Sequence, residues 1–232
     1  MISIKNLSKS YGKTKIVDNL SLEIKSGSIF GFLGPNGAGK TTTIKMIVGL
    51  SIPKKGSIQI SGKNNSDVKE SIGFMPEDPY FYEHLTATEF LNFMKNLFPN
   101  AKEDPQSLLE LVGLKDAAKQ KVGYFSKGMK QRLGLAQAIV NDPDYLFLDE
   151  PLDGLDPIGR REFKQILLGL KKKGKTIFFN SHVLSDVEEI CDQIGIIDKG
   201  KLVYSGNVKA FRGNKSLEDA FVDKLADKQV SR

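Results

Sequence analysis

The N-terminal part of the chain alternates apolar and polar residues in the manner of extended strands. Residues 2–4 and 20–24 both follow a period of two, which predicts antiparallel strands. Residues 29–33 are continuously apolar, as in a strand buried on both faces, and a glycine-rich turn then leads into a helical pattern over residues 41–50. The sequence therefore predicts a strand, a loop and a helix in direct succession.

The middle of the chain changes from strand-like to helical patterns. Residues 57–61 form another strand-like stretch, and residues 79–138 then turn mainly helical. Thr86 and Glu89 have the spacing of a capping box in front of apolar residues with helical periodicity. This pattern predicts a helical subdomain inserted at residues 79–140.

The second half of the chain returns to strands that are apolar throughout. Residues 145–148 and 176–179 are two such runs, and a helical segment over residues 157–173 separates them. A strand, a helix and a strand in this order predict parallel pairing in a buried sheet. Residues 194–204 favour a hairpin, and a last helix is expected from Ser216.

These elements predict an α/β fold in a single domain. Residues 1–78 and 141–232 form the expected core, a mixed and largely parallel sheet with an N-terminal antiparallel β subdomain. Residues 79–140 form the expected helical subdomain. The sequence contains no internal repeat and no linker long enough to separate independent domains.

Composition narrows the class of protein. With 34 Lys and Arg against 28 Asp and Glu, the formal charge is +6. The lysines are scattered, whereas a nucleic-acid binder usually concentrates its basic residues on one face, so we expect a solvated surface and no nucleic-acid partner. No apolar run reaches the roughly 18 to 20 residues of a membrane span. Cys191 is the only cysteine and the first residues lack an apolar signal run, which favours a cytoplasmic protein.

Residues 34–41, the phosphate loop, match the pattern G-x-x-x-x-G-K-[ST] in full. Glycines let backbone N–H groups turn toward phosphates, and the following helix N-terminus adds positive potential. Lys40 is expected to reach the β- and γ-phosphates, and Thr41 to offer its hydroxyl to Mg²⁺. A glycine-rich turn that binds nothing is the disfavoured alternative. The expected nucleotide-binding residues here are Gly34, Pro35, Asn36, Gly37, Ala38, Gly39, Lys40, Thr41 and Thr42.

Two adjacent carboxylates follow the apolar run at residues 146–148. Burying them would be costly unless their charges are used, so Asp149 is predicted to hold Mg²⁺, directly or through water. Glu150 is predicted to polarise the water that attacks the γ-phosphate. The alternative is a strand that simply ends in acidic turn residues, and the phosphate loop upstream disfavours it.

His182 directly follows the third buried strand, where ligands of open α/β sheets collect. A donor at this position could hold the γ-phosphate. On spacing alone, a structural or surface histidine is the more common case.

The stretch Phe125-Ser-Lys-Gly-Met129-Lys-Gln131-Arg132 completes a set of motifs. It lies between the phosphate loop and the acidic strand and resembles the signature motif of the ATP-binding subunits of ABC transporters. The resemblance covers almost the full chain, and implies the ABC ATPase fold on a P-loop NTPase core, with ATP and Mg²⁺ as ligands.

The resemblance also assigns roles to other residues. Residues 152–156 are similar to the D-loop, so Asp156 joins the expected site, and Ser181-His182 is similar to the switch histidine. Tyr11 is similar to the aromatic residue that stacks on adenine, against the alternative of a half-buried tyrosine at a strand end. Ser126 and Gly128 would contact nucleotide, against the alternative of an ordinary helix N-cap.

Two positions depart from the family pattern. Glu77 occupies a position where the family commonly has a glutamine. Lys127-Gly128-Met129 occupies the positions where the signature motif commonly reads Gly-Gly-Gln. Both variants resemble a bacterial exporter branch that pairs a single-domain ATPase with a separate membrane protein. Glu77 is expected at the edge of the nucleotide site as a candidate Mg²⁺ ligand. The alternative is a surface carboxylate before a turn.

The resemblance implies a mechanism in which two copies pair head to tail. Each ATP would lie between the phosphate loop of one chain and Ser126 and Gly128 of the other. Hydrolysis through Lys40, Glu150 and His182 would open the dimer and drive a transmembrane permease. The protein would then be peripheral on the inner face of the cell membrane.

Other classes of ATPase fit less well. A chromosome or DNA-repair ATPase would need a long coiled-coil insert, and a ribosome-associated ATPase would carry two cassettes. A soluble ABC-type ATPase acting on a cytosolic assembly, without a membrane partner, is the strongest rival. The aromatic residues at 80–82 cannot all face one side of a helix, so some should stay accessible, as aromatic residues at interfaces do. The resemblance implies that this segment faces the membrane subunit. The alternative is that these side chains pack the core of the helical insert.

Overall fold

The computed structural model describes residues 1–98, 101 and 103–230, which pack into two compact units. The first unit comprises Met1–Asp67 and Phe178–Arg232, and the second comprises Val68–Ile177. The predicted helical subdomain, residues 79–140, falls entirely within the second unit. Its separation from the core remains a prediction.

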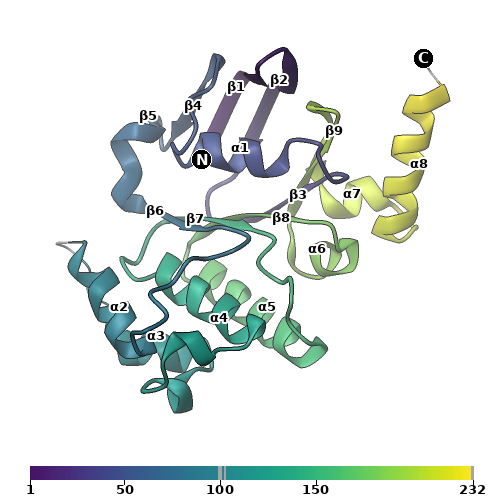
Figure 1. Cartoon of the computed structure of the whole chain (residues 1–232). Coiled ribbons are helices and arrows are strands. Elements are labelled where there is room, and N and C mark those ends of the chain that lie inside the picture. Colours follow the sequence, from purple (N-terminus) through teal and green to yellow (C-terminus); the bar gives the residue numbers. More distant parts are fainter. Residues whose placement is uncertain (99–100, 102, 231–232) are drawn as a thin grey trace. The chain divides into compact units, whose positions relative to one another are not determined.

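The strands and helices follow one another along the chain as in Figure 1. The strands are β1 (Ile2–Tyr11), β2 (Thr14–Ile24), β3 (Ile29–Leu33), β4 (Lys55–Ile60), β5 (Lys63–Asn64), β6 (Ile72–Met75), β7 (Tyr145–Asp149), β8 (Thr176–Ser181), β9 (Gln193–Asp198) and β10 (Lys201–Asn207). The helices are α1 (Lys40–Ile47), α2 (Ala87–Asn96), α3 (Pro105–Leu111), α4 (Lys127–Ala138), α5 (Pro157–Lys172), α6 (Leu184–Ile190), α7 (Val208–Arg212) and α8 (Leu217–Val230). Short 3-10 helices span Asn65–Ser71, Lys115–Ala117 and Val122–Tyr124.

The first unit contains an antiparallel sheet with the strand order β2-β1-β4-β5. Ile2 of β1 pairs with Ile24 on one side and with Ile60 on the other, and all three side chains are buried. The alternation of the first residues is therefore an alternation of core-facing and outward side chains, and the predicted antiparallel strands are confirmed.

The first unit also carries the buried strand β3, which pairs parallel with β9. β9 turns into β10 as an antiparallel hairpin, as predicted. Phe30 and Phe32 of β3 each lie 5.4 Å, between ring centroids, from Phe178 of β8. These rings exclude water from the strand that leads into the phosphate loop.

Helix α1 begins at Lys40, within the phosphate loop pattern, and ends at Ile47. The prediction of a helix to residue 50 was too long, because Gly49 adopts a left-handed conformation at φ 83°. The N–H group of Gly49 bonds the carbonyl oxygen of Met46, which closes the last turn.

The last helix, α8, begins where the sequence predicts it. The Oγ atom of Ser216 accepts a hydrogen bond from the N–H of Asp219 at 3.1 Å, as a helix N-cap does. The N–H of Leu217 donates to Glu188 Oε2 of α6 at 3.1 Å, which ties the start of α8 to an earlier helix of the same unit.

In the second unit, β6 pairs parallel with β7, in the register Ile72 opposite Tyr145. The helices of this unit begin at side-chain caps. Thr86 and Glu89 form the predicted capping box at α2, and Asp104 caps α3. Among the residues that the structure describes, no helix is both long and apolar enough to cross a membrane.

Candidate nucleotide site

The phosphate loop of the first unit lies tightly against neighbouring backbone. A Cβ atom on Gly34 would lie 2.3 Å from the carbonyl oxygen of Ile197, and one on Gly39 would lie 2.8 Å from that of Ile16. Gly39 also has a φ of 108°, a conformation that L side chains rarely adopt. Only glycine fits these two positions, so the loop packs closely against neighbouring backbone at both of them.

Lys40 is buried and its side chain turns back over the loop. Its Nζ donates to the carbonyl oxygen of Gly34 at 2.8 Å and to that of Pro35 at 3.4 Å. Thr43 Oγ1 donates to the carbonyl oxygen of Gly39 at 2.8 Å. The ammonium is therefore held at the start of the loop, at the positive end of α1.

The outer part of the loop is open to solvent. Pro35, Asn36 and Gly37 are exposed, and Thr41 and Thr42 are partly exposed. In the part of the chain that the structure describes, no side chain caps α1 at its N-terminus, and its first turn holds no acidic residue. The first N–H groups of the helix and the Lys40 charge are thus arranged for an anionic group such as a phosphate.

The two other predicted residues of the first unit lie at strand ends. Tyr11 ends β1 with 55% of its surface exposed, and Lys9 Nζ lies 5.3 Å from its ring centroid. This exposure also fits the alternative of a half-buried tyrosine at a strand end. His182 is exposed and directly follows β8. The stacking of Tyr11 on adenine and the phosphate contact of His182 remain predictions.

The second unit gathers the predicted carboxylates. Asp149 ends β7 and is 1% exposed, and Glu150 follows with a positive φ of 47°. The pKa of Glu77 is raised, first by burial and then by the negative charges of Asp149, Asp78, Glu150 and Asp153. Glu77 is itself exposed, as in the alternative of a surface carboxylate before a turn, and it lies within electrostatic range of the acidic pair. Its role as a Mg²⁺ ligand remains a prediction.

These carboxylates suit Mg²⁺ by their chemistry, since Mg²⁺ prefers hard oxygen ligands and usually keeps water and substrate phosphates in its coordination shell. Among the described residues, no group of three or more His, Cys, Asp or Glu side chains is arranged to hold a metal ion. Binding of Mg²⁺ by Thr41, Asp149 and Glu77 remains a prediction.

The signature turn caps helix α4. Ser126 Oγ accepts a hydrogen bond from the N–H of Met129 at 3.2 Å. Within a single chain, Ser126 therefore has the geometry of an ordinary helix N-cap, which is the alternative to nucleotide binding at this turn. Asp156 plays the same part for α5, where its Oδ1 accepts from the N–H of Gly159 at 2.6 Å. Contacts of Ser126, Gly128 and Asp156 with nucleotide remain predictions.

Sequence reasoning assigned no role to two residues of the signature stretch. Gln131 is 2% exposed, and its Nε2 donates to the carbonyl oxygen of Glu77 at 3.2 Å. Its Oε1 is buried without a hydrogen-bond partner among the described residues. Arg132 donates to the carbonyl oxygen of Val112 at 3.0 Å and pairs with Glu162 at 2.6 Å. Two polar residues at positions 131 and 132 of a buried helix were the feature of the sequence that could have indicated these contacts.

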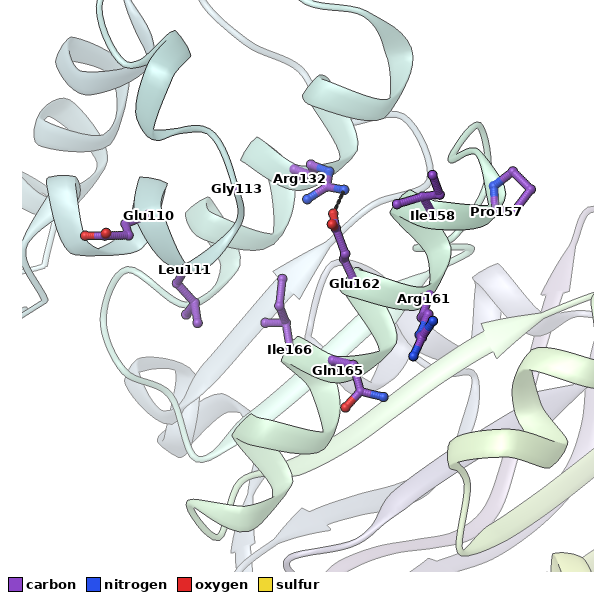
Figure 2. Close-up of a pocket in the computed structure, with 10 residues that line it drawn as sticks. All are labelled: Glu110, Leu111, Gly113, Arg132, Pro157, Ile158, Arg161, Glu162, Gln165 and Ile166. Carbon is purple, nitrogen blue, oxygen red and sulfur yellow. Dashed lines mark hydrogen bonds and ion pairs between the residues drawn. The ribbon is translucent and has the colours of Figure 1, made fainter.

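A pocket of about 690 Å³ lies beside Arg132 in the second unit. Figure 2 shows the Arg132–Glu162 ion pair between α4 and α5, with Ile158 and Ile166 on the same helix as Glu162. None of the predicted site residues lines this pocket. The pocket therefore adds no residue to the set predicted to bind nucleotide.

Comparison with known proteins identifies a family. A family model described as "ABC transporter" matches residues 17–153. An uncharacterized ABC transporter ATP-binding protein of Synechocystis sp. is 47% identical over 210 residues, which cover 87% of this chain and 59% of that protein. The chain thus spans about three fifths of that relative, and the same holds for a Nostoc relative, of which it covers 61%.

Two further relatives have more specific names. A bacitracin transport ATP-binding protein of Bacillus licheniformis is 46% identical over 88% of this chain and 68% of its own length. A lantibiotic transport ATP-binding protein of Streptococcus pyogenes is 40% identical over 97% of both chains. A solved structure of an ATP-binding subunit of an ABC transporter matches with a TM-score of 0.88 at 28% identity, covering 97% of this chain and 99% of that chain. The predicted fold class is confirmed.

Proposed function

We propose, from the premise that the chain belongs to the ABC transporter family, that it binds and hydrolyses ATP to power a transporter. The observation that carries this proposal is the phosphate loop. Lys40 is held at its start, close backbone contacts admit only glycine at two positions, and the N-terminus of α1 carries no competing acidic side chain in the described structure. This arrangement suits the phosphates of a nucleotide.

In the proposed reaction, the backbone N–H groups of the loop and Lys40 bind the β- and γ-phosphates. Glu150 orients and deprotonates the attacking water, and His182 holds the γ-phosphate. Mg²⁺, when bound, neutralises negative charge on the phosphates. Asp149 and Thr41 are the residues that would hold it, with Glu77 at the edge of the site.

The proposed working form is a homodimer in which two chains pair head to tail. Each ATP would lie between the phosphate loop of one chain and Ser126 and Gly128 of the other. ATP binding would close this dimer, and hydrolysis would open it, which is a two-state change biased by a ligand.

The proposed partner is a separate transmembrane permease, which would receive the motion at the aromatic residues after Glu77. Tyr80 is 83% exposed and Tyr82 is 44% exposed, whereas Phe81 is buried against Phe90. Together with their neighbours they line a pocket of about 410 Å³. Exposed aromatic side chains around a concave surface favour a protein interface. The chain would then act at the inner face of the cell membrane.

The proposed direction of transport is export. It rests on Glu77 and on the Lys127-Gly128-Met129 variant, which resemble the exporter branch with separate membrane subunits. Two of the relatives are named for bacitracin transport and for lantibiotic transport, which is compatible with a role of this chain in the transport of similar compounds.

Isolation of the tagged full chain from detergent-solubilised cells tests the partner. We expect a polytopic membrane protein to co-purify, and the MgATP hydrolysis rate to change when both are reconstituted in vesicles. A chain that hydrolyses MgATP at the same rate with and without this protein, and that instead co-purifies with a cytosolic assembly, would support the soluble ABC-type ATPase.

A further inference from the structure

Lys127, the first residue of α4, lies along the loop of residues 152–156. Its Nζ is 2.5 Å from Asp153 Oδ2. A Cβ atom on Gly154 would lie 2.5 to 2.8 Å from the Cγ, Cδ and Cε atoms of Lys127, so the aliphatic part of the side chain covers this glycine. One side chain therefore makes both a polar and an apolar contact with the same loop.

The next residue of α4 touches the loop as well. A Cβ atom on Gly128 would lie 3.4 Å from Leu155 Cδ2 and 3.6 Å from the carbonyl oxygen of Gly154. The loop is itself ordered by backbone bonds, including one from the N–H of Asp153 to the carbonyl oxygen of Glu150 at 3.1 Å. Two successive residues at the start of α4 thus pack on a compact turn.

A lysine in the first turn of a helix is unfavourable by charge alone. The N-terminus of a helix is its positive end, so a cation there is disfavoured. Asp153 offsets this cost, and the pKa of Lys127 is raised, first by its hydrogen bond to Asp153 and then by the charge of the same carboxylate. The family pattern has a glycine here, which could make neither contact.

We propose that Lys127 is a positioning residue that fixes the loop of residues 152–156 to the N-terminus of α4 within one chain. Ser126, Gly128 and Asp156 then belong to a single preformed surface rather than to two segments that move independently. The effect on the dimer rests on the proposed function, whereas the effect on the loop does not.

Hydrogen exchange at the amides of Asp153 and Leu155, in the full chain without nucleotide, tests the contact. In K127M the side chain keeps an unbranched apolar part, is one atom shorter than lysine and loses the charge, and we expect exchange to accelerate about two- to fivefold, the range that an exposed ion pair supports. D153N should accelerate exchange by the same factor. The double variant K127M/D153N should exchange no faster than either single variant. E162Q is the matched control, because it removes a different ion pair of α4, and should leave these amides unchanged. Unchanged exchange in K127M, or effects that multiply in the double variant, would overturn the proposal.

A second measurement tests whether the contact of Lys127 with the loop also affects the proposed dimer. In an E150Q background with MgATP, K127M should raise the dimer dissociation constant about two- to fivefold, while ATP affinity of the single chain stays constant. K127R should restore the dimer. If E150Q alone never dimerises, the proposed function fails and the exchange experiment still decides the contact. If exchange accelerates and the dimer is unaffected, Lys127 fixes the loop of residues 152–156, and the part of the proposal that concerns the dimer is overturned.

Discussion

The ammonium of Lys40 donates a hydrogen bond to the carbonyl oxygen of Gly34, 2.8 Å away, and so joins the last part of the phosphate loop to the first. The proposed site has this cation at its centre, and K40A removes it. We expect calorimetry with MgATP to show a loss of binding by at least about tenfold, in line with the roughly 1.5–3 kcal/mol of a charge-assisted hydrogen bond. K45A, an exposed lysine of the same helix, is the control and should bind normally. Equal affinity of K40A and the parent would contradict the loop assignment.

G34A tests the close packing of the loop. The added Cβ would lie 2.3 Å from the backbone oxygen of Ile197, which cannot move aside as a flexible side chain can. We expect a loss of about 3 kcal/mol in the free energy of unfolding, and so a melting temperature lower by about 6 to 12 °C. In contrast, G169A lies in α5 with nothing within 4 Å of the new Cβ, and should leave the melting temperature equal or higher.

Strands β5 and β6 and the helix cap at Asp104 were not predicted. Most other strands, the phosphate loop and the helix caps at Thr86 and Ser216 could be predicted from the sequence because they depend on local patterns. Thr86 and Glu89, for example, indicate their capping box by spacing alone.

The end of α1 was misjudged, since apolar periodicity continues past Gly49 while the backbone turns there. The Lys127–Asp153 contact joins residues far apart in the chain, and nothing in either local pattern specifies it. Helices α6 and α7 are short enough that periodicity gives little signal.

E77Q tests the electrostatics of the acidic group by pH. Burial and neighbouring carboxylates raise the pKa of Glu77 above its ordinary value of 4.5, so the folded state disfavours its ionised form. Glu77 therefore costs no stability below pH 4.5, and lowers stability as the pH rises from that value through its raised pKa. We expect E77Q to melt at a higher temperature than the parent at neutral pH, with a difference that shrinks on acidification to pH 4.5. A difference that grows on acidification would contradict this account.

Variants of the aromatic segment at residues 80–82 test which of its side chains form an interface and which belong to the core. Y80A together with Y82A should weaken binding to the membrane partner while the melting temperature changes by only a few degrees, because both side chains are exposed. F81A removes a ring that is 4% exposed and lies 5.1 Å from the ring centroid of Phe90, and should cost about 3 to 5 kcal/mol of stability. Thermal melts and pull-down with the co-purifying membrane protein check both. If the double tyrosine variant is strongly destabilised and still binds its partner normally, these tyrosines belong to the core.

Sedimentation velocity of E150Q with and without MgATP tests the central claim most directly. The amide keeps the shape of the side chain but cannot accept the proton of water, so turnover should fall by about two orders of magnitude or more while ATP still binds. The account predicts a monomer without nucleotide and a stable dimer with MgATP, and a monomer in both conditions for K40A with E150Q. An E150Q chain that stays monomeric with bound MgATP, or that hydrolyses ATP within about tenfold of the parent, would contradict it.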